Sequence, residues 1–270
     1  MSTTAGGAGI RTPGRVFFAL TMIGIGILGL TRGAFTPTWS GVPKAFPARA
    51  ALAYLCALVC LASGIGLMWR RTAGVAARML VGSFVIWVVL IRLPGILKAP
   101  AATDPWWAIG DTAVMLAASL VLYSCLAADA DRRRFGVAPS DKTLRIARIF
   151  FGLGLIPFGV AHFTYFQHTV DMVPAWMPWH VAWASLTGAG FIAAGAAVLT
   201  GVYARLAATL VTLQLGAFTL LVWVPVVAAH PSPSDWAEFV SSWVLTAAAW
   251  VVVDSYRETW PAHSGSIADR

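Results

Sequence analysis

The sequence predicts an all-α, polytopic membrane protein with eight transmembrane helices, built as two repeated four-helix bundles. Three observations predict this class: the composition, the apolar segments and an internal repeat. The chain is 59% hydrophobic and 11% charged, with a mean hydropathy of +0.76. Soluble domains carry about 25% charged residues. A chain of 270 residues with so few charges cannot cover its surface in water. We therefore expect lipid to be its solvent.

Eight apolar segments approach the roughly 20 residues that cross the hydrocarbon core of a bilayer. Each segment must satisfy its own backbone hydrogen bonds in lipid, which predicts helix throughout. The segments cover roughly 15–32, 50–69, 72–92, 106–127, 143–162, 180–200, 203–224 and 236–254. The first resembles a signal peptide, but no small-x-small cleavage site follows Leu30. We therefore expect it to remain as the first span.

The basic residues predict the orientation. With eight spans both termini share one side of the membrane, and fourteen of the 19 Lys and Arg residues fall on that side. By the positive-inside rule, both termini are expected in the cytoplasm. The net charge of +8 is spread over single residues and segment ends. That pattern favours contact with anionic lipid headgroups over nucleic-acid binding.

The chain contains an internal repeat. A shift of 131 residues places Pro43 on Pro174, Pro47 on Pro178, Pro94 on Pro225, Pro100 on Pro231 and Asp104 on Asp235. Upstream, a shift of 128 aligns residues 35–36 with 163–164. We predict two four-helix units at 15–127 and 143–256, joined by a charged linker at 128–142 and flanked by cytoplasmic tails at 1–14 and 257–270. Both units begin and end on the same side, so the repeat is parallel.

Proline and glycine indicate where the units bend and pack. Pro43 and Pro47, like Pro174 and Pro178, break the helical ladder and predict an interfacial or re-entrant segment before each second helix. Small residues let transmembrane helices approach closely. The glycines expected at such contacts are Gly24, Gly26, Gly29, Gly152, Gly154, Gly159, Gly188 and Gly190.

Three of the five histidines lie in AHFTYFQHTVDMVPAWMPWH, residues 161–180. In the repeat His162 meets Ala34 and His180 meets Arg49, so the unit needs no histidine to fold. One interpretation is an interfacial loop, because Trp and Tyr gather at headgroup depth. The other is a quinone pocket with His162 as its polar anchor. In that pocket His180, Trp176 and Trp179 lie at the mouth, and Asp171 orients an imidazole. The histidine spacings match no compact metal motif, which disfavours metal or haem.

Three further polar residues lie within spans. Asp111 is a functional candidate, because a carboxylate inside the membrane is costly, and we expect it to pair with Arg92 or Lys98. Gln214 either joins two helices or lines a cavity. Asp235 and Glu238 suit the positive N-terminal end of the last helix.

The second unit carries GLGLIPFGVAHFTYF, MVPAWMPW and TGAGFIAAGAAVLTGVYARLAATL. These stretches resemble the DoxX family of four-helix membrane proteins, over about residues 140–255. Members of this family are bacterial inner-membrane proteins, so the resemblance implies that location. Some members are linked to quinone-coupled sulfur oxidation or to oxidative-stress complexes. It implies no family-wide catalytic set. We expect a redox-associated protein, at most an accessory subunit of a quinone-linked oxidoreductase. The alternative is a non-catalytic scaffold or lipid-binding subunit.

Overall fold

The computed structural model describes residues 12–126, 141–229 and 232–256. Eight helices in this part are long and apolar enough to cross a membrane, and it contains no strand, so the predicted fold class is confirmed. The linker predicted at 128–142 and the two predicted tails lie almost wholly outside the described residues. Six spans are single helices: α1 (Pro13–Arg32), α2 (Arg49–Met68), α5 (Thr103–Leu126), α7 (Asp141–Thr164), α9 (His180–Thr200) and α12 (Pro233–Asp254).

The third and seventh spans each contain a π-helical segment. The third consists of α3 (Ala73–Trp87), η2 (Val88–Arg92) and α4 (Leu93–Lys98), and the seventh of α10 (Ala204–Ala217), η3 (Phe218–Trp223) and α11 (Val224–Ala229). Each π segment ends two residues before a proline, Pro94 or Pro225. Proline clashes with the carbonyl four residues earlier, and the wider π turn makes room for it. The predicted ends at 92 and 224 were therefore too early.

The proline elements before the second helix of each unit form turns in both units. Two short helices lie in the preceding loops, η1 (Pro37–Trp39) and α8 (Phe166–Asp171). The residue before each second helix, Ala48 or Trp179, has a positive φ of 53° or 61°. These two positions are 131 residues apart, so the backbone repeats the strained entry into the helix.

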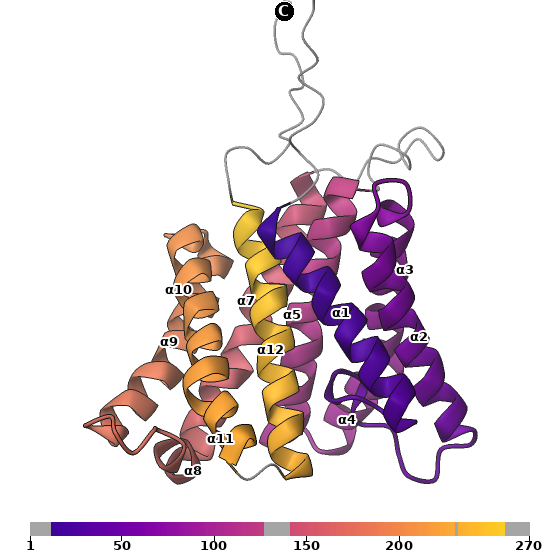
Figure 1. Cartoon of the computed structure of the whole chain (residues 1–270). Helices are drawn as coiled ribbons and strands as arrows, with labels where there is room; N and C mark the ends of the chain where they lie inside the picture. Colours follow the sequence, from indigo (N-terminus) through magenta and orange to yellow (C-terminus); the bar gives the residue numbers. More distant parts are fainter. Residues whose placement is uncertain (1–11, 127–140, 230–231, 257–270) are drawn as a thin grey trace, which may run out of the picture.

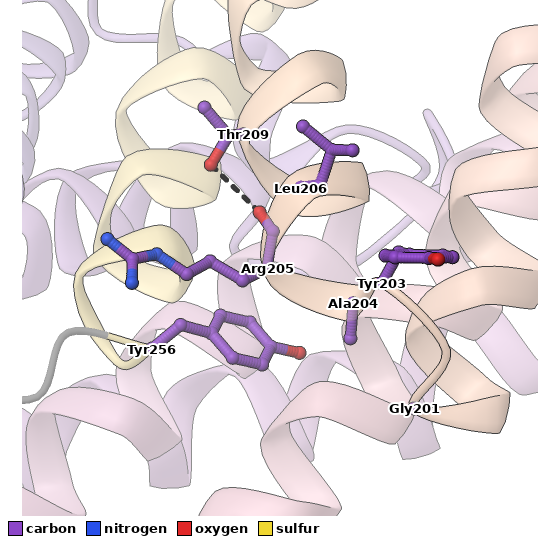
Figure 2. Close-up of a pocket in the computed structure, with 7 residues that line it drawn as sticks. All are labelled: Gly201, Tyr203, Ala204, Arg205, Leu206, Thr209 and Tyr256. Atoms are coloured by element: carbon purple, nitrogen blue, oxygen red, sulfur yellow. Dashed lines mark hydrogen bonds between the residues drawn. The ribbon is translucent and has the colours of Figure 1, made fainter.

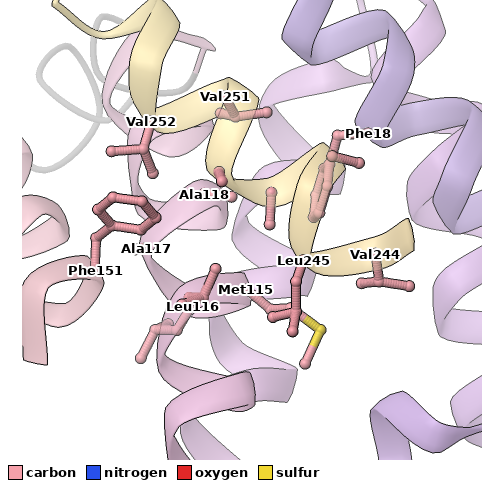
Figure 3. Packing of buried hydrophobic residues seen from close by; sticks show 14 of the residues in the cluster. Phe18, Met115, Leu116, Ala117, Ala118, Phe151, Val244, Leu245, Val251 and Val252 are labelled. Carbon is pink, nitrogen blue, oxygen red and sulfur yellow. The ribbon is translucent and has the colours of Figure 1, made fainter. Parts of the chain in front are cut away.

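The two units share their central helices. The last span of each unit, α5 or α12, packs against the last span of the other (Figure 1). The first span of each unit also contacts the other unit. α1 packs against α2 of its own unit and α12 of the other, and α7 packs against α9 of its own unit and α5 of the other. The units therefore form one body around α5 and α12. Figure 3 shows side chains of these two helices meeting Phe18 of α1 and Phe151 of α7.

Polar and aromatic contacts hold α1 against α12. The indole N–H of Trp243 donates to Thr21 Oγ1 at 3.1 Å, and Phe17 lies edge-on to the Trp243 ring at 5.4 Å. The backbone N–H of Gly14 donates to the Asp254 carboxylate at 2.9 Å. Hydrogen bonds of this kind are valuable in lipid because water is absent as an alternative partner.

Glycines bring three helices into backbone contact. A Cβ added to Gly154 of α7 would lie 2.9 Å from Gly110 O of α5, and one added to Gly195 of α9 would lie 2.7 Å from Gly152 O of α7. The predicted close packing is therefore present at these positions. The prediction for Gly24 is wrong, because a Cβ there would meet nothing within 4 Å.

Candidate functional site

His162 lies in the last turn of α7, half-buried among aromatic rings. Its ring centroid is 5.2 Å from that of Phe191 on α9 and 5.9 Å from that of Phe218, whose plane is within 17° of parallel. Phe218 opens the π segment η3. A Cβ on Gly188 would lie 2.9 Å from His162 Cβ, so glycine is what lets α9 approach the imidazole. Three helices therefore hold this ring.

The hydrogen bond of His162 assigns its tautomer. Nδ1 lies 2.7 Å from the carbonyl oxygen of Phe158, one turn earlier in α7. A carbonyl oxygen only accepts, so Nδ1 carries the proton and Nε2 of the neutral imidazole is left as an acceptor. An acceptor nitrogen beside aromatic rings recognises a hydroxyl donor. A quinone carbonyl only accepts hydrogen bonds, so it does not fit an acceptor nitrogen, whereas the hydroxyl of the reduced quinol does.

The other residues predicted for this site do not gather around His162. The rings of Trp176 and Trp179 are 71% and 78% exposed, and His180 begins α9. Asp171 is exposed and accepts a hydrogen bond from Gln167 Nε2 at 2.8 Å, so its carboxylate orients an amide instead of an imidazole. These side chains fit the interfacial interpretation of the loop.

Gln214 joins α10 to α9. Its Nε2 donates to the carbonyl oxygen of Thr187 at 3.1 Å, and a Cβ on Gly190 would lie 2.9 Å from its Oε1. Gln214 is one turn before Phe218, so this contact helps to fix the wall of the aromatic cluster. The geometry favours the joining role over a cavity-lining role.

The first unit fills the corresponding place with its own tryptophan. Cys60 and Trp87 stand where the second unit has Phe191 and Phe218. Trp39 of η1, only 2% exposed, lies against both: its indole N–H points at Cys60 Sγ (3.1 Å), and its centroid is 5.0 Å from that of Trp87. In the second unit the equivalent loop forms the peripheral helix α8, and His162 lies between the helices instead. Sequence reasoning missed Trp39, because only the repeat combined with the contacts identifies it.

Arg92 and Asp111 form a second polar site, near the end of the bundle that carries α4 and α8. Arg92 is 5% exposed; its Nε donates to Thr112 Oγ1 at 2.9 Å, and both terminal nitrogens lie 3.4 Å from Ser40 Oγ. Asp111 Oδ1 is buried and has no hydrogen-bond partner among the described residues. The hydrogen bonds of the guanidinium go to these two hydroxyls, so the predicted pairing of Asp111 with Arg92 is electrostatic. Arg92 still acts on the Asp111 charge through space, as does Glu238 with the opposite effect.

Buried hydroxyls occupy the matching position of the second unit. Ser242 stands where the repeat places Asp111. Its hydroxyl lies 2.7 Å from that of Thr219 in η3, which lies 3.3 Å from that of Thr246. This cluster joins the π segment to α12 without charge. The charged form of the site is thus specific to the first unit. Asp235, expected at the positive end of the last helix, lies in its first turn and forms a capping box with the N-cap residue Ser232.

Tyr165 ties the two units together at the same end. Its hydroxyl donates to Asp104 Oδ1 at 2.6 Å, which joins the end of α7 to the start of α5. The hydrogen bond to the carboxylate raises the pKa of the Tyr165 phenol, because it stabilises the protonated form. In the repeat Asp235 matches Asp104 but serves its own helix.

No group of three or more His, Cys, Asp or Glu side chains within residues 12–126, 141–229 and 232–256 is arranged to hold a metal ion. Comparisons with protein-family models, curated proteins and solved structures found no match to this chain. Eight apolar helices indicate a multi-pass protein in a lipid bilayer. The function must therefore be argued from the sites themselves.

Proposed function

We propose that this chain is a DoxX-like, redox-associated protein of the bacterial inner membrane, with cytoplasmic termini, that binds a quinol-type ligand at His162. One observation carries the proposal: a half-buried imidazole with a free acceptor nitrogen packs against the rings of Phe191 and Phe218. A quinol is an aromatic ring with hydroxyl donors and an apolar tail. It reaches such a site through the bilayer, and its hydroxyl would donate to Nε2.

The repeat supports a specialised role for His162. The first unit has Ala34 at this position and closes the corresponding space with Trp39. The fold can therefore fill this space with the largely apolar side chain of Trp39. The second unit instead places His162 there, whose imidazole is titratable and carries a lone pair. Polar groups within membrane segments are costly and mark function by default.

The test is ligand retention by protein purified in mild detergent. Wild type is compared with His162→Phe, which keeps a ring of similar size and removes the acceptor. It is also compared with His180→Ala, which removes a half-buried histidine at the same end that makes no ring contact with His162 among the described residues. Extracted small molecules are identified by mass spectrometry. We expect a near-stoichiometric quinol or quinone in wild type and in His180→Ala, and a loss of about tenfold in His162→Phe, since a lost hydrogen bond in a buried site costs about 1–3 kcal/mol.

Equal amounts of bulk lipid in all three proteins, with no bound quinol or quinone, would overturn the proposal. Thermal unfolding of each variant in the same detergent serves as the control for folding. A His162→Phe protein that unfolds as wild type does, yet has lost the ligand, separates binding from packing.

A second candidate function is a non-catalytic scaffold or lipid-binding subunit. The observation that favours it is the mutual backbone contact of Gly110 with Gly154 and of Gly152 with Gly195, which fits a protein whose helices serve assembly. His162 would then fill space as Trp39 does in the first unit. This candidate predicts that His162→Phe leaves every cellular and biochemical readout unchanged, whereas enlarging Gly154 abolishes them.

A further inference from the structure

An open depression of about 550 Å³ lies at the end of the molecule where α1 begins and α12 ends, far along the chain from the His162 site. It lies between the turn that joins α9 to α10 and the residue that follows α12. Figure 2 shows its lining, which consists of Gly201, Tyr203, Ala204, Arg205, Leu206, Thr209 and Tyr256. None of these residues is acidic, so the depression carries the positive charge of Arg205.

Several hydrogen-bond donors of the depression lack partners. The guanidinium of Arg205 is exposed and makes no hydrogen bond or ion pair with any described residue. The Tyr256 hydroxyl is buried and also without a hydrogen-bond partner there. The first backbone N–H groups of α10, from Ala204 on, have no side-chain cap. Free N–H groups at a helix N-terminus favour an anion, so the start of α10 and the Arg205 guanidinium point to the same class of ligand.

A second arginine, Arg148, packs against the face of the Tyr256 ring. The Arg148 guanidinium lies 3.9 Å from the centre of the Tyr256 ring and donates to the carbonyl oxygen of Ser255 at 2.7 Å. It thereby fixes the ring and adds a second positive charge beside the depression. Arg148 Nε is itself buried without a hydrogen-bond partner among the described residues. The site is therefore held in place by groups outside its lining.

An apolar stripe leads from the depression along α10. Leu206, Leu210 and Leu213 follow one another at helical spacing and are 55%, 57% and 64% exposed. Residues at this spacing share one face of a helix. Arg205 at one end and the leucines beyond it reproduce the order of a phospholipid, with the phosphate first and the acyl chains after it.

We propose that this depression binds the phosphodiester of an anionic glycerophospholipid. Arg205 and the α10 N-terminus contact the phosphate, the Tyr256 ring forms one side of the depression, and an acyl chain lies along Leu206 and Leu210. Basic pockets between transmembrane helices are suited to such headgroups. The inference does not depend on the His162 ligand.

The first unit supplies a matched control. The repeat places Gly74 at the position of Arg205 and Cys125 at that of Tyr256, so the donor set is absent there. The corresponding turn between α2 and α3 nevertheless carries an exposed basic residue, Arg71. Arg71→Ala therefore removes the same charge from the same end of the molecule without touching the proposed site.

The test is native mass spectrometry of the full-length protein with phosphatidylglycerol or phosphatidylcholine of identical acyl chains. Wild type, Arg205→Ala, Tyr256→Phe and Arg71→Ala are titrated side by side. We expect one tightly bound phosphatidylglycerol on wild type. Its affinity should fall about fivefold in Arg205→Ala, which corresponds to about 1 kcal/mol for one basic residue. It should stay unchanged in Tyr256→Phe, which removes only a buried hydroxyl, and in Arg71→Ala.

Two results would overturn the proposal. Equal binding of the two lipids, or equal losses in Arg205→Ala and Arg71→Ala, would mean that the charge acts diffusely and that no site exists. Displacement of the lipid by millimolar inorganic phosphate would mean that the depression recognises free phosphate instead of a lipid. Because Arg205 is exposed and makes no described contact, its loss should not affect folding, which the unfolding temperature checks.

Discussion

Arg92 illustrates how a charge is kept inside a membrane-spanning segment. Its guanidinium is satisfied by the hydroxyls of Thr112 and Ser40, and a carboxylate stands nearby without a direct contact. Hydroxyl acceptors keep the donors bonded, while the Asp111 charge acts at longer range. Burial of an unpaired charge is strongly unfavourable, so these interactions act as a unit.

Loss of Arg92 should therefore destabilise the fold. Arg92→Ala leaves the Asp111 carboxylate without its opposite charge, and breaking a buried pair in this way costs about 3 kcal/mol. Arg32→Ala, at an exposed position near the same end of the molecule, is the control and should change the stability by less than about 0.5 kcal/mol. Reversible unfolding in SDS measures both. Equal stability of the two variants would show that the site is not structural.

At the scale of elements, contacts between glycines set how closely α5, α7 and α9 approach. Gly154 faces Gly110 on α5, while Gly152 faces Gly195 on α9, so α7 is in backbone contact on two sides. Interdigitated surfaces of this kind replace the hydrophobic effect, which does not drive helices together in lipid. The joint between the two units depends on the first of these contacts.

Gly154→Ala tests this joint. The new Cβ would lie 2.9 Å from Gly110 O, a backbone atom that cannot move aside, so we expect a destabilisation of about 1–3 kcal/mol. Gly24→Ala is the matched change on α1: nothing lies within 4 Å of its Cβ, so stability should stay equal or rise. The SDS midpoint of unfolding decides. A Gly154→Ala protein as stable as Gly24→Ala would mean that α5 and α7 can separate at little cost.

At the scale of the whole molecule, the two units behave as one body. The central pair α5 and α12 is shared, and each first helix leans on the last helix of the other unit. The two proposed sites lie at opposite ends of the second unit, one beside α8 and the other at the turn before α10. The first unit has neither, since Ala34 stands at the position of His162 and Gly74 at that of Arg205. Duplication has thus left one unit free to differ in its side chains.

The sequence predicted the spans well because apolar length is a strong signal in lipid. It ended two spans early at Pro94 and Pro225, because a π turn that absorbs a proline leaves no mark in hydropathy. It identified His162 by comparison with Ala34, yet grouped it with Trp176, Trp179 and Asp171, which lie apart from it. Local spacing cannot show which side chains a loop turns outward. The buried hydroxyl cluster around Thr219 was also missed, because Ser and Thr side chains do not interrupt an apolar run in the sequence.

His162 is proposed to accept a hydrogen bond from the hydroxyl of its ligand. The most direct measurement is a titration of the purified protein with a decyl-substituted benzoquinol, the corresponding quinone and the dimethyl ether of the quinol, followed by tryptophan fluorescence. We expect the quinol to bind about tenfold more tightly than the other two ligands, a difference equivalent to one hydrogen bond. We also expect His162→Phe to abolish this preference. Equal affinities for all three ligands, or a preference that survives His162→Phe, would contradict it.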